Sequence, residues 1–278
     1  MPPLPFIVTI IVLLALAALG VAAGVSAPAP YGIIRESWRQ TLDVFRYRSL
    51  LPLFAFALFF VQIAAPLAIN LYPPENQWVA AAFLVLAQAL VTYALAHVAY
   101  RLHRGLIYGE WAAGLSFGAR ERRMALYVLA SWFFVTILSH LPIPAPPLIA
   151  PAVAPILGAA LWLQAFVVKV LFALIGPAAS LDDPKPLRRS IASVWREPAA
   201  IFAIVVIVQL TLTFLNAVFS LATGASLGLA ILRGGITLLA TTFFYILSEF
   251  ALVIVLTRVW EDQYEPETRY AAHNLNWL

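Results

Sequence analysis

The stretch WVAAAFLVLAQALVTYALAHVAYRLHR, at residues 78–104, decides the fold because a long apolar run in it ends in basic side chains. The run at 78–100 holds no Asp, Glu, Lys or Arg, and about 20 apolar residues are enough to cross a bilayer as a helix. Backbone amides in hydrocarbon must find partners within the chain, which predicts a helix. Arg101 and Arg104 then mark the cytoplasmic end of this span, because basic residues gather on that side of a membrane.

The rest of the chain repeats this alternation. Of its 278 residues, 63% are hydrophobic and 11% are charged, whereas soluble domains devote about a quarter of their residues to charge. The composition predicts an all-α integral membrane protein with seven transmembrane helices, one N-terminal helix followed by three helical hairpins. The predicted spans are 5–27, 50–70, 78–100, 124–141, 152–178, 199–221 and 235–257. They use up the length and leave no room for a soluble catalytic domain.

The distribution of charge predicts the orientation of these spans. The connections at 71–77, 142–151 and 222–232 contain a single charge, Glu75, whereas the other connections are basic. The basic connections hold Arg35, Arg39, Arg46 and Arg48; Arg101, Arg104, Arg120, Arg122 and Arg123; Lys185, Arg188, Arg189 and Arg196; and Arg258 and Arg269. The positive-inside rule places the N-terminus outside and the C-terminus inside a bacterial cytoplasmic membrane. Anionic lipid headgroups then account for the net charge of +4, with no need of nucleic acid.

Three units follow one another along the chain. The predicted units are an N-terminal transmembrane helix at 1–30, a six-span helical core at 31–258 and a cytoplasmic tail at 259–278. The first helix is predicted to stay uncleaved, because its leading residues lack basic side chains and cleavage would leave the arginines at 35–48 outside. Within the core, Arg48, Arg123 and Glu197 precede the three hairpins at a nearly constant interval. That interval indicates either three weak repeats or the ordinary alternation of a multi-hairpin protein.

Two of the basic segments are predicted to be amphipathic helices that lie in the headgroup layer. In each, apolar residues recur at helical spacing while charged residues occupy the other face. The residues assigned to these interfacial helices are Trp38, Arg39, Arg46 and Arg48 in the first and Arg188, Arg189 and Trp195 in the second. The second helix has a clear predicted start, with Asp183 as the N-cap and Pro184 in the first turn. The segment at 106–123 contains three glycines and is predicted to be a poorer helix.

Two stretches carry a resemblance to a known group of proteins. They are HRGLIYGEWAAGLSFGARERR at 103–123 and PAASLDDPKPLRRSIASVWREP at 177–198. Both resemble the cytoplasmic connections of uncharacterised bacterial multi-pass membrane proteins, which are similar to the membrane domain attached to some glycerophosphodiester phosphodiesterases. The resemblance covers 31–258, and it departs from the group where Arg196 and Glu197 replace a Gly-Asn pair after the tryptophan. The phosphodiesterase domain has no counterpart, so the resemblance implies a membrane module without an activity.

Two ionisable side chains fall inside predicted spans, where burial in lipid is costly and often marks function. Lys169 and Glu249 lie at matching depths, roughly 13 Å from the inner ends of their helices at about 1.5 Å per residue. They form a candidate intramembrane charge pair if their helices are neighbours. The alternatives are that Lys169 snorkels to the interface while Glu249 is protonated or bonded to Tyr245, or that the pair is a substrate or proton site.

The sequence offers no catalytic, metal or cofactor site. Cysteine is absent, which excludes disulfides, thiolate nucleophiles and thiolate metal ligands. The four histidines are predicted at dispersed depths and do not converge on a metal, and for His97 an ordinary polar contact is favoured over ligation of a tetrapyrrole. Asp182 and Asp183 precede a proline, so they indicate the start of a helix rather than a pair of catalytic carboxylates. We therefore predict that the protein is not an enzyme.

The first span carries a face of small residues, Ala17, Gly20 and Gly24. A Gly-x-x-x-Gly spacing lets two helices approach closely, either within one molecule or between this chain and a partner subunit. The sequence thus predicts an accessory or scaffolding subunit of a membrane complex, or a protein of envelope organisation, that contacts anionic lipids and a protein partner. The alternative is a transporter of a small or lipid-like solute through the region of Lys169 and Glu249, although the broken helices typical of transporters are missing.

Overall fold

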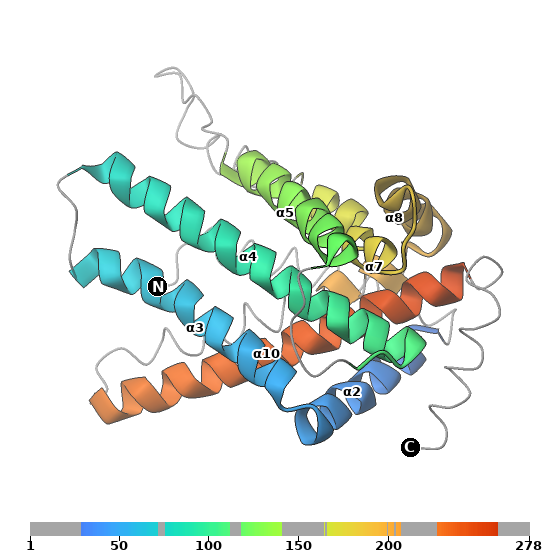
Figure 1. Ribbon diagram of the computed structural model, residues 1–278, viewed down its shortest axis with the longest axis horizontal. Coiled ribbons are helices and arrows are strands. Elements are labelled where there is room, and N and C mark those ends of the chain that lie inside the picture. The colour runs from blue at the N-terminus through green and yellow to red at the C-terminus, as the bar shows by residue number, and fades with distance from the viewer. Residues whose placement is uncertain are drawn as a thin grey trace, which may run out of the picture.

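The computed structural model describes residues 29–71, 76–111, 118–140, 164, 166–198, 200–202, 204–206 and 227–260. Every secondary-structure element in these ranges is a helix, which confirms the all-α class. The elements are α2 (Ala29–Tyr47), α3 (Leu50–Leu71), α4 (Gln77–Tyr108), α5 (Ala119–His140), α7 (Ile175–Ser180), α8 (Pro186–Arg196) and α10 (Leu227–Val259). Figure 1 shows α4 between α3 and α5, with α7 beside α8 and with α2 beside α10.

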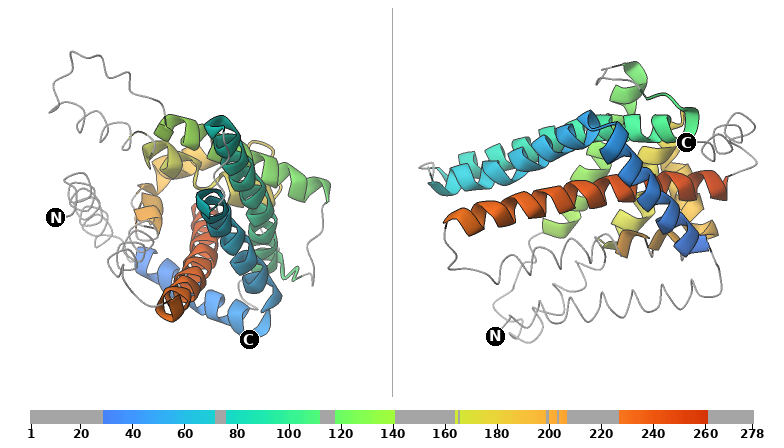
Figure 2. Two further views of the ribbon diagram at one scale, coloured as in Figure 1. Left: turned by 90° about the vertical axis from the view of Figure 1, so that its left-hand side faces the viewer. Right: turned by 90° about the horizontal axis from the view of Figure 1, so that it is seen from below.

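Among the described residues, two helices contain segments long and apolar enough to cross a membrane. They are Trp78–Tyr108 in α4 and Gly234–Val259 in α10, and the apolar 18-residue window within each has a mean hydropathy of 2.1. The helices α2 and α3 meet at 96°, and counting Gly32–Tyr47 and Leu50–Ala65 as one broken span raises the number to three. Figure 2 shows α3 running along α10 while α2 turns away and crosses it. Helices of this length and composition indicate a membrane-associated protein, whereas seven spans and their orientation stay predictions.

Several predicted features lie outside the described residues. The first span at 5–27, with its small-residue face at Ala17, Gly20 and Gly24, is one of them, and most of the acidic tail is another. The predicted spans that begin at 50, 78, 124 and 235 fall on α3, α4, α5 and α10, respectively. Hydropathy therefore located these helices correctly, because the length of an apolar run is a local property of the chain.

Specific backbone partners fix both ends of α4. The side chain of Asn76 accepts a hydrogen bond from the Trp78 amide at 2.8 Å, which satisfies one of the free amides of the first turn. At the other end Gly109 adopts a left-handed conformation with φ of 69°, and its amide reaches back to the carbonyls of Arg104 and Gly105. A glycine tolerates this conformation without a steric penalty, so the helix ends there.

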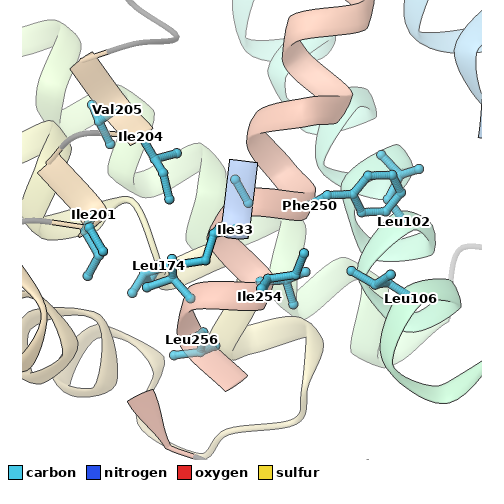
Figure 3. Packing of buried hydrophobic residues seen from close by; sticks show 14 of the residues in the cluster. Ile33, Leu102, Leu106, Leu174, Ile201, Ile204, Val205, Phe250, Ile254 and Leu256 are labelled. Atoms are coloured by element: carbon cyan, nitrogen blue, oxygen red, sulfur yellow. The ribbon is translucent and has the colours of Figure 1, made fainter. Parts of the chain in front are cut away.

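The core is centred on α10. Within the apolar window of its candidate span, 56% of the residues are buried, against 17% for α4. Phe250 is wholly buried, and in Figure 3 it points toward Leu102 and lies near Leu106 of α4. On the opposite side Ile254 lies near Leu174, which precedes α7. The last turns of α10 are thus surrounded by other helices.

Large apolar side chains also cover the outer faces of the helices. Phe60 of α3 is 57% exposed, and Leu86 and Leu90 of α4 are 59% and 61% exposed. A soluble monomer rarely exposes contiguous apolar surface of this kind, since its transfer from water to an apolar medium is favourable. These faces suit contact with lipid chains.

The two predicted interfacial helices bury small polar residues and expose several large apolar ones. Ser190 and Ser193 of α8 are wholly buried, while Trp195 is 79% exposed and Leu187 is 44% exposed. Similarly, α2 buries Ser37 and Thr41, while Trp38 is 47% exposed although its ring meets that of Phe243 at 4.8 Å. Exposed apolar side chains beside exposed arginines, such as Arg39 and Arg188, fit a helix in the headgroup layer.

The predicted start of α8 needs a correction. The helix begins at Pro186, whereas the sequence predicts Asp183 as the N-cap and Pro184 in the first turn. Asp183 still stabilises this end, because its carboxylate accepts a hydrogen bond from the Lys185 amide at 2.8 Å. A second proline follows Lys185, and a proline fits the first helical position, which moves the boundary onward.

We expect Phe250→Ala to lower the free energy of unfolding by about 3 kcal/mol or more, because it leaves a cavity among tightly packed side chains. Thermal unfolding in mild detergent measures the loss. The matched control is Leu239→Ala in the same helix, whose side chain is 54% exposed. Equal losses for the two variants would show that the end of α10 is not packed as described.

Candidate functional site: a polar network joining α4, α5, α7 and α10

The last turns of α4 carry basic side chains that reach three other elements. The predicted span ends at residue 100, but α4 continues to Tyr108, so His103 lies in the helix and not in a connection after it. Successive helical residues project at about 100° to one another, so neighbouring positions reach different partners. The contacts are Arg101 with Glu121 of α5, His103 with Glu249 of α10, and Arg104 with Asp182 after α7. These partners satisfy the charges and let the helix continue.

His103 is wholly buried and uses both ring nitrogens. Its Nδ1 lies 3.0 Å from Oγ of Ser180, and its Nε2 lies 3.0 Å from Oε2 of Glu249. The Ser180 hydroxyl donates its one hydrogen to the carbonyl of Pro177 at 2.6 Å. The histidine must then donate from Nδ1 to Ser180, which leaves one proton to be shared between Nε2 and the Glu249 carboxylate.

This shared proton keeps the pair neutral overall. The pair is either imidazolium with carboxylate or imidazole with carboxylic acid, and both forms avoid an unpaired charge in a medium of low dielectric constant. Serine, histidine and glutamate are also the parts of a nucleophilic triad. Ser180 is wholly buried in α7, however, and its hydroxyl points at the Pro177 carbonyl. The arrangement therefore connects helices and does not present a nucleophile to a substrate.

Arg104 forms a second group of contacts one residue further along α4. Its Nε and Nη2 bind both carboxylate oxygens of Glu110 at 2.7 and 2.8 Å, and its Nη1 binds Asp182 at 3.0 Å. Arg120 of α5 reaches the same oxygen of Asp182 at 3.1 Å. Bidentate bonding of this kind fixes both distance and orientation. The hydrogen bond from Arg104 lowers the pKa of Glu110, so this carboxylate stays ionised to a lower pH than usual.

Asp182 links α4 to α5 and adopts an uncommon backbone conformation. Its φ of 62° lies in the left-handed region, which a residue other than glycine adopts only when its surroundings hold it there. Here two arginines bind its carboxylate. We infer that these contacts hold the short turn between α7 and α8 in place.

The C-terminal end of α10 is tied to α8 by stacked side chains. Arg189 and Arg196 lie over the ring of Trp260, with 4.1 and 3.7 Å from each guanidinium carbon to the ring centroid. The indole nitrogen of Trp260 donates to Ser193 Oγ at 2.6 Å, and Arg189 also binds Asp183 at 2.6 Å. Of the predicted interfacial residues, Arg189 thus faces the protein, whereas Arg188 and Trp195 are exposed.

A small cavity adjoins this network between α4, α5, α7 and α10. Its volume is about 190 Å³. Its polar lining comes from Thr92, Ser131, Tyr245 and Glu249. Tyr245 donates to the carbonyl of Leu95 at 2.8 Å, so it is not the partner of Glu249 that the sequence allows. The described partner of Glu249 is His103, which contacts the Oε2 atom of the carboxylate.

The structure brings together only part of the predicted site. Lys169 lies on an exposed position of the helical residues before α7, and its pairing with Glu249 stays a prediction that no described contact supplies. His103 and Ser180 were missed by the sequence analysis. The one signal available for His103 was its position two residues after Arg101, on a helix that had no proline to end it. Nothing local marks Ser180, because serine is common in short connections.

The described residues contain no group of three or more His, Asp or Glu side chains that could hold a metal ion. Comparisons of the chain with known protein families, with curated proteins and with solved structures find no match.

We expect His103→Leu and Glu249→Leu to destabilise the protein by about 3 kcal/mol each, because either change leaves a buried polar group without its partner. The double variant should lose less than the sum of the two, since both members of the pair are then apolar. Thermal unfolding in detergent measures all three. Additive losses would contradict a direct contact between the two side chains.

Proposed function

We propose that the protein is a non-catalytic, multi-pass protein of the bacterial cytoplasmic membrane that acts as an accessory or scaffolding subunit of a membrane complex. The observation that carries this proposal is the polar network, in which ionisable side chains are engaged between helices. Arg104 and His103 each bind a side chain from another part of the chain, and Arg189 lies over the ring of Trp260. Such contacts fix the relative positions of helices, which is what a scaffold needs.

The proposal includes seven spans with the N-terminus outside and the C-terminus inside. The inward-facing ends of α4 and α10 would then meet in the cytoplasmic headgroup layer, together with α2 and α8. The exposed Trp195 and Leu187 of α8 support this placement, because aromatic and apolar side chains favour the boundary between lipid and water.

The absence of cysteine makes this topology directly testable. We expect Glu75→Cys to react with a membrane-impermeant maleimide in spheroplasts whose membrane is intact. Lys185→Cys should react only after the membrane is permeabilised, because it lies in a predicted cytoplasmic connection. Labelling of both positions from the same side would contradict the proposed arrangement of spans.

A partner subunit is expected to bind through the small-residue face of the first span. We expect Gly20→Leu combined with Gly24→Leu to release a partner that co-purifies with the wild-type protein in mild detergent, since bulky side chains prevent close helix contact. The matched control is Gly234→Leu combined with Gly235→Leu in α10, where an added Cβ meets no described atom within 4 Å. Release by both pairs, or by neither, would contradict a specific role of the first span.

Transport of a small or lipid-like solute is the second candidate function. The cavity of about 190 Å³ favours it, because Glu249 lies in its lining and intramembrane carboxylates often bind protons or solutes. Purification discriminates between the two candidates. A stable complex favours the scaffold, whereas a lone protein whose stability rises with one solute, and falls back in Glu249→Leu, favours transport.

A further inference from the structure

A second cavity, separate from the polar network, lies where α2 turns into α3. Its volume is about 700 Å³. The described lining consists of Arg39, Gln40, Asp43, Val44, Tyr47, Arg48 and Trp111. The first five recur at helical spacing on one side of α2, Arg48 stands at the 96° corner, and Trp111 follows the end of α4. Three separate segments thus build this cavity.

In this cavity Arg39 and Arg48 form no ion pair with a described carboxylate. Among the described residues, Arg101, Arg104, Arg189 and Arg258 each have a carboxylate partner, and no such partner is found there for Arg39 or Arg48. Arg48 instead lies over the ring of Trp111, 5.5 Å from its centroid. A cation–π contact holds the side chain by the ring face and uses none of its hydrogen-bond donors.

Trp111 forms a fixed wall of the cavity. Its ring packs so closely on Gly105 that a Cβ there would lie 2.5 Å from the nearest ring atom. Only glycine leaves room for this contact, which fixes the indole against the backbone of α4. Arg48 is therefore positioned by a rigid partner.

We propose that this cavity binds the phosphodiester of a phospholipid headgroup through Arg39 and Arg48. Guanidinium groups match phosphate oxygens in both charge and geometry. Among the described lining residues, Asp43 leaves one positive charge in excess, which suits a phosphodiester better than a doubly charged phosphate. Asp43 and Gln40 offer acceptors for the hydroxyl groups of a glycerol headgroup, so phosphatidylglycerol is the lipid we expect.

The neighbouring surface favours a lipid over a free anion. The exposed face of α3 starts two residues after Arg48, with Leu50 and Leu53 both 62% exposed and Phe54 48% exposed. An acyl chain attached to a headgroup in the cavity has an apolar surface to follow there, which a soluble phosphate does not use. Tyr47 and Trp111 supply the aromatic rings that favour the headgroup level.

The test uses the full-length protein in nanodiscs of phosphatidylcholine with increasing phosphatidylglycerol. Bound lipid is counted by native mass spectrometry, and thermal stability is followed in parallel. We expect Arg39→Gln combined with Arg48→Gln to weaken retention of phosphatidylglycerol by about tenfold or more, because two charge-assisted contacts are lost. The matched control, Arg35→Gln with Arg122→Gln, removes the same charge from exposed positions outside the cavity and should retain the lipid.

Variants of Asp43 and the addition of inorganic phosphate provide two further tests. Asp43→Leu should weaken retention of phosphatidylglycerol, since it removes an acceptor for the glycerol hydroxyl groups, whereas Asp43→Asn keeps one acceptor oxygen and should retain the lipid. Inorganic phosphate alone should leave stability unchanged. Equal retention by the Arg39/Arg48 and control variants, or stabilisation by phosphate equal to that by the lipid, would overturn the proposal. Lipid binding in this cavity rests on the proposed membrane location and needs no partner subunit. The outcome of the co-purification experiment is therefore independent of the outcome of the lipid experiment.

Discussion

The contact of His103 with both Ser180 and Glu249 is the constraint on which the rest of the structure depends. These three residues come from α4, α7 and α10, and their bonds at 3.0 Å require the three elements to meet at one depth. In a medium of low dielectric constant a buried imidazole or carboxylate without a partner is strongly destabilising. The polar groups therefore decide which helices are neighbours, while apolar packing around Phe250 fills the space between them.

The other polar contacts extend outward from this centre. Arg104 and Arg120 meet on Asp182 and so connect α4, α5 and the turn before α8. Trp260 then holds α8 against the end of α10. The result is one end of the molecule that is rich in ion pairs and another that is formed by apolar helices. Polar contacts thus fix the relative positions of the helices at that end.

The sequence predicted the parts of this structure that depend on local composition. The apolar runs that became α3, α4, α5 and α10 were recognisable because about 20 such residues have few alternatives to a helix in lipid. Glu249 was recognisable as unusual because a carboxylate in an apolar run is costly. Its partner was not, since Lys169 and His103 are both far from it in the sequence and only the packing of helices selects between them. Asp183 was correctly placed near the start of α8, although the boundary itself moved to Pro186.

By itself the sequence determined an all-helical chain with long apolar segments, because hydropathy and the hydrogen bonding of the backbone act within each segment. Tertiary structure decided which side chains form sites. It gave the basic residues at the end of an apolar run contacts with three other elements. It also placed Arg39 and Arg48 in the lining of a cavity beside Trp111. The physical reason is that charge pairing depends on distances of about 3 Å across helices, and such distances are set only once the helices pack. The basic end of 78–104 thus joins α4 to α5, α7 and α10.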